Sequence, residues 1–193
     1  MKKINLLLFT VAAGLLQACT GNKSTSGSDS TAMTTDTTKV ATVKTDSSAT
    51  VLADTAFASK AAVGGMAEVA LGKMAAGKGN SGKVKDFGNM MVKDHGKANA
   101  ELTSIAKAKN IILPAGLDAG HQAKSDSLSK LSGKDFDAAY VNAMIEGHQK
   151  TLALMQSEAT GGKDAELKAF AAKTAPIVQM HLSEIMKIKD GLK

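Results

Sequence analysis

Four long stretches of the chain repeat apolar residues at steps of three and four positions, the spacing of one face of an α-helix. They lie between residues 55 and 190, where alternating or β-branched runs typical of strands are almost missing and proline occurs only at positions 114 and 176. Such a pattern argues against a β-sheet fold. It predicts four amphipathic helices, each of which must bury its apolar face against the others.

The breaks between these stretches give the expected helix boundaries. Two glycine-containing breaks, GKG at residues 77–79 and TGG at residues 160–162, are short enough to join antiparallel helices. A longer segment, 110–131, joins the two hairpins. We therefore predict an all-α four-helix bundle with a long crossover that contains a short extra helix, and with Asp54 as the cap of the first helix. The expected helices cover residues 55–76, 81–109, 118–131, 135–159 and 164–189.

The same periodicity gives the expected core. The apolar or small residues on these faces are Phe57, Ala61, Gly64, Leu71 and Ala75 in the first helix; Val84, Phe87, Met91, Ala98, Leu102 and Ile105 in the second; Phe136, Tyr140, Met144, Thr151 and Met155 in the third; and Leu167, Phe170, Thr174, Ile177, Ile185 and Ile188 in the last.

Each of these faces also carries one ionisable residue near its middle. These residues are Glu68, His95, His148 and His181. In both predicted hairpins the second of them lies five residues farther from the turn than the first. That offset is about 7 Å of helical rise, which loop details can partly absorb. We therefore expect the four side chains to meet in one layer of the bundle.

Burial of these groups among Leu, Met and Phe needs a compensating partner, because an unpaired buried charge costs several kcal/mol. One carboxylate and three neutral imidazoles can satisfy one another by binding a cation, and they are common ligands of Zn, Fe, Mn and Cu. We predict a single transition-metal site formed by Glu68, His95, His148 and His181. The alternative is a metal-free hydrogen-bonded cluster in a structural or interaction module of the cell envelope.

Several neighbouring residues are candidates for supporting roles. Met91 and Met144 each precede a predicted histidine ligand by one helical turn, as MVKDHGKA and MIEGHQKT, so their thioethers are candidate soft ligands, as for Cu(I). They are equally explained as core residues. Glu184, one turn after His181, either orients the His181 ring or is a surface charge. We expect Asp94, Glu146 and His121 to face solvent instead.

Four motifs carry a resemblance to a known family. They are GGMAEVALGKMA around Glu68, VKDFGNMMVKDHGKANAEL around His95, FDAAYVNAMIEGHQKTLALM around His148 and ELKAFAAKTAPIVQMHL around His181. In order and spacing the chain resembles, from about residue 55 to 190, a ferritin-like family of secreted bacterial domains of unknown function, often described as outer-membrane proteins. The resemblance implies a ferritin-like four-helix bundle and a metal site, and it implies no particular reaction.

The chain departs from the ferritin-like proteins that oxidise iron. Those enzymes carry Glu on the first helix, Glu-x-x-His on the second, Glu on the third and Glu-x-x-His on the fourth. Here the two carboxylate positions before the histidines are Val92 and Val178, and the ligand of the third helix would be His148. One carboxylate in place of four leaves too little negative charge for two ferric ions. We therefore expect one ion.

The N-terminus predicts secretion and lipid anchoring. The basic start MKK is followed by the apolar run INLLLFTVAAGLLQA, which is too short to span a membrane and is typical of a signal peptide. The residues LQAC, ending at Cys19, resemble the lipobox of bacterial lipoproteins. The resemblance implies that residues 1–18 are removed and that Cys19 is lipidated. Because position 21 is Gly rather than Asp, we expect the outer membrane, with the protein facing the periplasm.

The segment after the lipidation site differs in composition from the rest. Sixteen of residues 20–53 are Ser or Thr, and such a segment cannot bury enough apolar surface to offset the entropy of ordering. We predict a disordered tether over residues 19–53 and one folded domain over residues 54–193.

Charge and motifs exclude other functions. All 24 basic residues are lysines, so the arginine forks and stacking aromatics of a nucleic-acid site are missing, and we expect no nucleic-acid partner. The sequence shows no Ser–His–Asp spacing, no phosphate-binding glycine loop and no pair of catalytic carboxylates. An enzymatic role is therefore not what the sequence favours.

Overall fold

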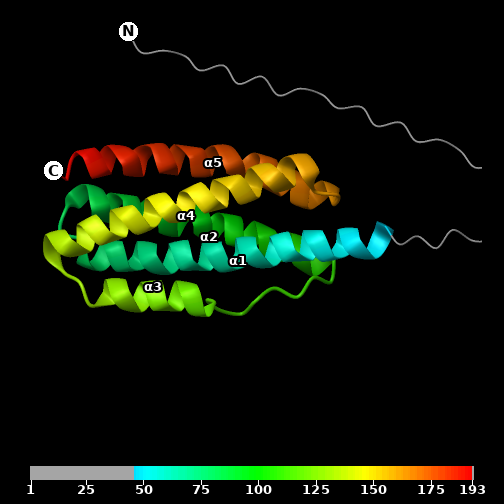
Figure 1. The fold of residues 1–193 in the computed structure, drawn as a ribbon, viewed down its shortest axis with the longest axis horizontal. Coiled ribbons are helices and arrows are strands. Elements are labelled where there is room, and N and C mark those ends of the chain that lie inside the picture. Colours follow the sequence, from blue (N-terminus) through cyan, green and yellow to red (C-terminus); the bar gives the residue numbers. More distant parts are fainter. Residues whose placement is uncertain (1–45, 193) are drawn as a thin grey trace, which may run out of the picture. The chain divides into compact units, whose positions relative to one another are not determined.

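The computed structural model describes residues 46–192, and this part of the chain forms five helices and no strand (Figure 1). The signal peptide, Cys19 and most of the expected tether lie outside the described residues. The prediction of an all-α fold is confirmed. The helices are α1 (Asp46–Lys78), α2 (Gly82–Ala108), α3 (Ala119–Ser129), α4 (Gly133–Gly161) and α5 (Ala165–Asp190).

The helices pack as two antiparallel hairpins, α1 with α2 and α4 with α5, which lie side by side (Figure 1). Helix α1 also lies against α4, and α2 against α5, so the four long helices surround a common interior. The connection from α2 to α4 returns along the length of the bundle and carries α3 on the outside of α1. The predicted four-helix bundle with a helix-containing crossover is therefore confirmed.

Four of the five helices begin and end within two residues of the predicted positions, and α1 is the exception. It begins at Asp46 rather than at residue 55, and therefore extends into the segment predicted as tether. In this extension Val51 is 59% and Leu52 is 70% exposed. Val51 and Leu52 thus gain little from burial; this part continues a helix already nucleated by the packed part, because each added residue gains a backbone hydrogen bond.

Helices α1 and α2 approach each other closely because two glycines face each other. A Cβ atom on Gly72 would lie 2.8 Å from the carbonyl oxygen of Gly88, and a Cβ on Gly88 would lie 2.6 Å from that of Gly72. Neither distance accommodates a side chain, so this hairpin requires glycine at both positions.

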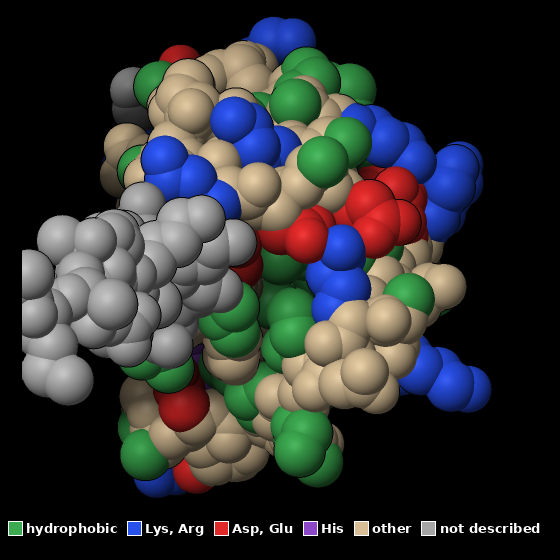
Figure 2. Space-filling view, turned by 90° about the vertical axis from the view of Figure 1, so that its right-hand side faces the viewer, with side chains coloured by type: hydrophobic (Ala, Val, Ile, Leu, Met, Phe, Trp, Pro, Cys, Tyr) green, Lys and Arg blue, Asp and Glu red, His purple; other side chains and the backbone are tan. Residues whose placement is uncertain are grey.

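Figure 2 looks at the end where the α4–α5 turn lies, and lysine, acidic and hydrophobic side chains all appear on this face. Within the described part of the chain, none of the helices has the length and apolar character that crossing a membrane would require.

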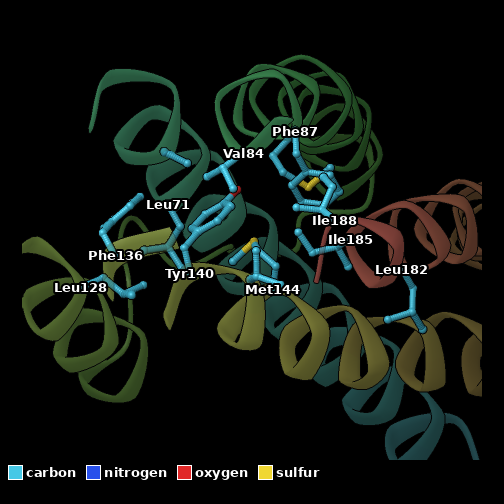
Figure 3. Close-up of a cluster of buried hydrophobic side chains, with 13 residues drawn as sticks. Leu71, Val84, Phe87, Leu128, Phe136, Tyr140, Met144, Leu182, Ile185 and Ile188 are labelled. Atoms are coloured by element: carbon cyan, nitrogen blue, oxygen red, sulfur yellow. The ribbon is translucent and has the colours of Figure 1, made fainter. Parts of the chain in front are cut away.

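Two hydrophobic clusters fill the interior. The first, shown in Figure 3, includes Phe87, Phe136, Tyr140 and Met144, and Leu128 of α3 packs against it. The second includes Phe57, Leu102 and other residues of α1, α2, α4 and α5. The predicted ionisable residues belong to neither cluster, although all four are at most 4% exposed.

The predicted core is largely correct, with one error near the middle of α5. Ile177 is 38% exposed, whereas its neighbour Val178 is fully buried. The apolar face therefore runs from Thr174 to Val178 by a four-residue step and not to Ile177 by a three-residue step. Both steps fit a helix of 3.6 residues per turn, so the sequence could not separate them.

A buried aspartate from each hairpin holds the turn of the other hairpin. The carboxylate of Asp137 accepts hydrogen bonds from the backbone N–H groups of Asn80 (2.8 Å) and Ser81 (2.7 Å). Asp54 likewise accepts from the N–H groups of Lys163 (3.2 Å) and Asp164 (3.1 Å). Asp54 therefore lies inside α1 and does not cap it, contrary to the prediction. These bonds fix the ends of the two hairpins against each other.

Glu158 lies near Asp54, and the charge of Lys168 only partly offsets the cost of its burial. It is 8% exposed, and its Oε1 atom has no hydrogen-bond partner among the described residues. Burial, together with the nearby carboxylates of Asp54 and Asp164, raises the pKa of its carboxyl above the ordinary value. Because the folded-state pKa is the higher one, the proton stabilises the fold below the ordinary pKa. This stabilisation is lost as the pH rises through the folded-state value.

Replacing Glu158 by glutamine should therefore stabilise the protein at neutral pH. We expect Glu158→Gln to raise the free energy of unfolding at pH 7 by about 1 kcal/mol and to give no gain at acidic pH. Urea denaturation at a series of pH values measures this difference. The control Glu184→Gln removes an exposed carboxylate paired with Lys187 and should change little. A loss of stability in Glu158→Gln at pH 7 would contradict the interpretation.

Candidate metal centre

Three histidines from three helices meet in the centre of the bundle. His95 of α2, His148 of α4 and His181 of α5 are 4%, 0% and 0% exposed. Their ring centroids form a nearly equilateral triangle with sides of 5.5, 5.2 and 5.5 Å. Each offers one ring nitrogen such that the three nitrogens lie within 4.8 Å of one another. The predicted meeting of these three residues in one layer is correct.

Each histidine ring contacts an acceptor through one of its nitrogens. His148 Nδ1 lies 2.8 Å from the carbonyl oxygen of Met144, one turn earlier in the same helix. His181 Nε2 lies 3.0 Å from Asp94 Oδ2 of α2. His95 Nδ1 lies 2.8 Å from Glu68 Oε2 of α1. Because a carbonyl or carboxylate only accepts, the neutral rings of His148 and His181 must donate at these nitrogens and carry their lone pairs on the other nitrogens. The His95 contact is close but lacks hydrogen-bond geometry, and a carboxylate beside Nδ1 favours the same tautomer there.

The other three ring nitrogens are buried without a partner. They are His95 Nε2, His148 Nε2 and His181 Nδ1, and none of them makes a hydrogen bond with a described residue. Leaving a buried acceptor unsatisfied costs about 1–3 kcal/mol each. A cation bound between the three lone pairs would remove this cost. The arrangement matches metal sites in which each ligand histidine donates its second nitrogen to a carbonyl or carboxylate.

The spacing of the rings also fits one ion. With the ion about 2.1 Å from each nitrogen and each nitrogen about 1.1 Å from its ring centre, tetrahedral ligands have ring centres roughly 5.2 Å apart. The observed sides of 5.2–5.5 Å agree. The nitrogens themselves would then be about 3.4 Å apart, so small rotations of the rings complete the site.

Burial favours the neutral form of two of the imidazoles, those of His148 and His181. It lowers the pKa of His148, and the nearby Glu68 carboxylate only partly opposes this effect. Burial also lowers the pKa of His181, to about 4, although the hydrogen bond with Asp94 acts in the opposite direction. At neutral pH both rings therefore present lone pairs, which is the form that binds metal ions.

Glu68 lies at one edge of the histidine triangle. Its Oε1 is 3.6 Å from His148 Nδ1 and 3.4 Å from the Thr151 hydroxyl, which donates to it. Its Oε2, although 2.8 Å from His95 Nδ1, makes no contact with hydrogen-bond geometry. Burial raises the pKa of this carboxyl, but the imidazoles, His95 first, lower it by more, so Glu68 is ionised. Glu68 thus places one negative charge beside the Nδ1 atoms of His95 and His148, and not beside their unpartnered Nε2 atoms.

Phe87 closes the triangle on the side toward the α2–α5 groove. Its ring centroid lies 6.0 Å from that of His148 and 6.3 Å from that of His181. The Tyr140 ring packs edge-on against Phe87, and its buried hydroxyl has no partner among the described residues. Burial, with a smaller effect of the Glu68 charge, raises the pKa of that hydroxyl. The site is therefore bounded by aromatic rings on one side and by a carboxylate on another.

Comparison with known proteins gives a family without an assigned activity. The profile of the domain of unknown function DUF4142 matches residues 37–188, most of the chain. The chain belongs to this family. Comparison with curated protein sequences gives no significant match for this DUF4142 protein.

Two solved structures share the fold of the DUF4142 domain. Both are of a protein described as CopM, one in a Cu(II)-bound form and one in an Ag-bound form obtained by co-crystallisation. Their TM-scores are 0.62 and 0.59, and each covers 72% of this chain and 97% or 96% of the CopM chain. The sequence identity is 16% in both cases, so the likeness establishes the bundle fold alone.

Asp94 is the site residue that the sequence prediction missed. It was expected to face solvent, but it is only 28% exposed at its side chain and contacts His181 across the α2–α5 seam. Of the two roles left open for Glu184, the structure has the surface charge, because its carboxylate is bonded to Lys187. A carboxylate directly before His95 was the available signal, but its significance depends on which neighbouring helix that side of α2 faces.

The remaining candidates fall into two groups. Met91 and Met144 are buried in the hydrophobic cluster beside the site, and their role as soft ligands stays a prediction. His121 is exposed and paired with Asp118, and Glu146 is paired with Lys124 and Lys150, as expected of surface residues. The lipidation of Cys19 concerns a residue outside the described part.

Proposed function

We propose that this domain binds one transition-metal ion through His95 Nε2, His148 Nε2 and His181 Nδ1. The observation that supports this proposal is the convergence of three buried lone pairs that have no protein partner. Glu68 lies beside the Nδ1 atoms of His95 and His148 and would balance part of the charge of the ion, and its role as a fourth ligand stays a prediction. Among the described residues, only two carboxylates, Glu68 and Asp94, contact the three rings, whereas dinuclear iron sites carry four carboxylate ligands, so one ion is favoured.

Copper is the ion that the donor set favours. Neutral imidazole suits Cu and Zn, and for a given set of nitrogen donors divalent copper binds more tightly than zinc. The copper-bound form of CopM, which shares the fold, is consistent with this choice. The buried thioethers of Met91 and Met144 lie in the neighbouring cluster and would suit the reduced, softer ion. We therefore place Cu first and Zn second.

The proposed setting is the outer membrane. Lipid attached at Cys19 would anchor the chain, and the Ser/Thr-rich segment would hold the bundle away from the membrane on its periplasmic side. In this setting a tethered domain that binds one ion tightly would sequester or sense that metal in the envelope. No reaction is part of the proposal.

Elemental analysis tests the proposal directly. The protein, purified without a histidine tag and dialysed after exposure to Cu(II) or Zn(II), should retain one ion per chain. His148→Ala should retain much less, whereas His121→Ala, which removes an exposed histidine outside the site, should retain one. Retention below one ion per ten chains in the wild type would contradict the proposal.

Asp94 should strengthen binding by holding His181 in the tautomer whose Nδ1 is free. Removing such a partner of a ligand histidine typically weakens metal affinity 10- to 100-fold. We therefore expect Asp94→Ala to raise the Kd for Cu(II) by roughly 10- to 100-fold, as measured by competition with a chelator of known affinity.

Glu101→Ala is the matched control for Asp94→Ala. It also removes a carboxylate of α2 that pairs with a side chain of α5, namely Lys173 at 2.7 Å. It does so away from the histidines and should leave the Kd unchanged. Equal effects of the two substitutions would show that Asp94 acts only through general packing of α2 against α5.

A further inference from the structure

The three histidines are almost completely buried, so an ion can reach them only through an opening in the bundle. A cleft of about 600 Å³ lies between α1, α3 and α4, and its wall includes Glu68. On the opposite side, the groove between α2 and α5 ends at Phe87, whose ring stands against His148 and His181. The cleft therefore reaches the histidines through Glu68, whereas the ring of Phe87 separates the groove from them.

We infer that the cleft between α1, α3 and α4 is the route by which the ion enters and leaves, and that the negative charge of Glu68 at its floor attracts the ion to the layer of the histidines. This inference rests on the proposed function. Glu68 belongs to both places, because it lines the cleft while its oxygens lie 2.8 Å from His95 Nδ1 and 3.6 Å from His148 Nδ1. Its Oε1 accepts a 3.4 Å hydrogen bond from the hydroxyl of Thr151, which also lines the cleft.

Two glycines keep the floor of this cleft open. A Cβ atom on Gly147 of α4 would lie 3.9 Å from Glu68 Oε1, and one on Gly64 of α1 would lie 4.0 Å from the Thr151 hydroxyl. Both distances are ordinary contacts, so helix packing does not require glycine here, in contrast to Gly72 and Gly88. Glycine inside a helix costs about 1 kcal/mol relative to alanine. The space that they leave open beside Glu68 explains why glycine occupies these two positions despite that cost.

The charges around the cleft do not repel a cation. The charged residues on its wall are Lys60, Lys124, Lys150, Asp118, Glu146 and Glu68, three of each sign. Two of the lysines bind the same carboxylate, Glu146, at 2.9 and 2.6 Å. His121 also lies on the wall and is exposed, so an imidazole is present before the ion meets Glu68.

Narrowing the floor of the cleft tests the inference. A blocked path raises the barrier equally for entering and leaving, and therefore slows association and dissociation without changing the Kd. We expect Gly147→Leu and, from the opposite wall, Gly64→Leu each to slow Cu(II) association about tenfold, with the Kd within about threefold of wild type. Gly147→Ala, for which there is room, should bind at nearly the wild-type rate.

The chain contains its own reporter for this experiment. Tyr140 is its single tyrosine and there is no tryptophan, and its ring packs against Phe87 beside the histidines. Stopped-flow quenching of its fluorescence by Cu(II) follows the arrival of the ion, and transfer to a strong chelator follows its release. The control is Gly96→Leu, which makes the same change inside α2 at a position with open space around it.

Each outcome decides the inference. Slower association and release at an unchanged Kd in either leucine variant, with Gly96→Leu at the wild-type rate, supports the route. Wild-type rates in both leucine variants, or slower association with unchanged release and a weaker Kd, overturn it. Absence of Cu(II) binding by the wild-type protein would instead contradict the proposed function.

Discussion

Saturating Cu(II) is expected to raise the midpoint of thermal unfolding by about 10 °C. An ion that binds only the folded state at 100 times its Kd adds about 2.7 kcal/mol to the free energy of unfolding. For a domain of this size, 1 kcal/mol shifts the midpoint by roughly 4 °C. The gain should be large because the ion would bind His95 of the first hairpin together with His148 and His181 of the second, so that unfolding must break its coordination.

Variants separate binding at the centre from binding elsewhere. His148→Ala should lose most of the Cu(II)-dependent shift, whatever its own midpoint without metal. His121→Ala should keep the full shift, because His121 is exposed and paired with Asp118. Differential scanning calorimetry with and without Cu(II) gives both numbers. A shift of equal size in His148→Ala and in the wild type would place the bound ion outside the histidine triangle.

Asp137→Ala is expected to lower the free energy of unfolding by about 3 kcal/mol. Asp137 is 1% exposed, and its carboxylate accepts from two backbone N–H groups in the α1–α2 turn, at 2.8 and 2.7 Å. Hydrogen bonds to a charged group contribute about 1.5–3 kcal/mol each, and removing the acceptor leaves both donors without a partner. The start of α4 would also lose its attachment to the first hairpin.

Urea denaturation measures this loss, with the slope of the transition checking that two-state behaviour is kept. Asp118→Ala is the matched control, because Asp118 also accepts from a backbone N–H, that of His121, but at the exposed start of α3. Its removal should cost about 1 kcal/mol. Asp54→Ala, whose two bonds are longer, should fall between the two. If Asp137→Ala lowers the free energy of unfolding no more than Asp118→Ala does, burial does not strengthen the contribution of these hydrogen bonds to stability.

The periodicity of the sequence was sufficient to predict the four-helix bundle and the burial of the three histidines in its interior. An apolar face with one histidine in its middle leaves that histidine no direction except inward, and equal offsets from the turns bring the four helices into register. The start of α1 was not predictable in the same way. Val51 and Leu52 are exposed although they lie in the helix, so a composition that disfavours packing says little about whether a helix continues through it.

The contacts made by aspartates were not predictable from one sequence. Asp54, Asp94 and Asp137 each bond to a group at least 56 residues away. Periodicity indicates that such a residue lies beside an apolar face, but the rotation of each helix against its neighbour decides whether a partner is there. For the same reason the sequence could name Glu184 as the partner of His181 when the structure places Asp94 there.

The most direct test of the metal centre is a crystal structure of the Cu(II)-loaded protein, with the ion located by its anomalous scattering. We predict one peak inside the bundle, about 2 Å from His95 Nε2, His148 Nε2 and His181 Nδ1, with Asp94 still holding the far nitrogen of His181. A peak confined to surface residues such as His121, with the three buried rings left uncoordinated, would contradict the proposed site.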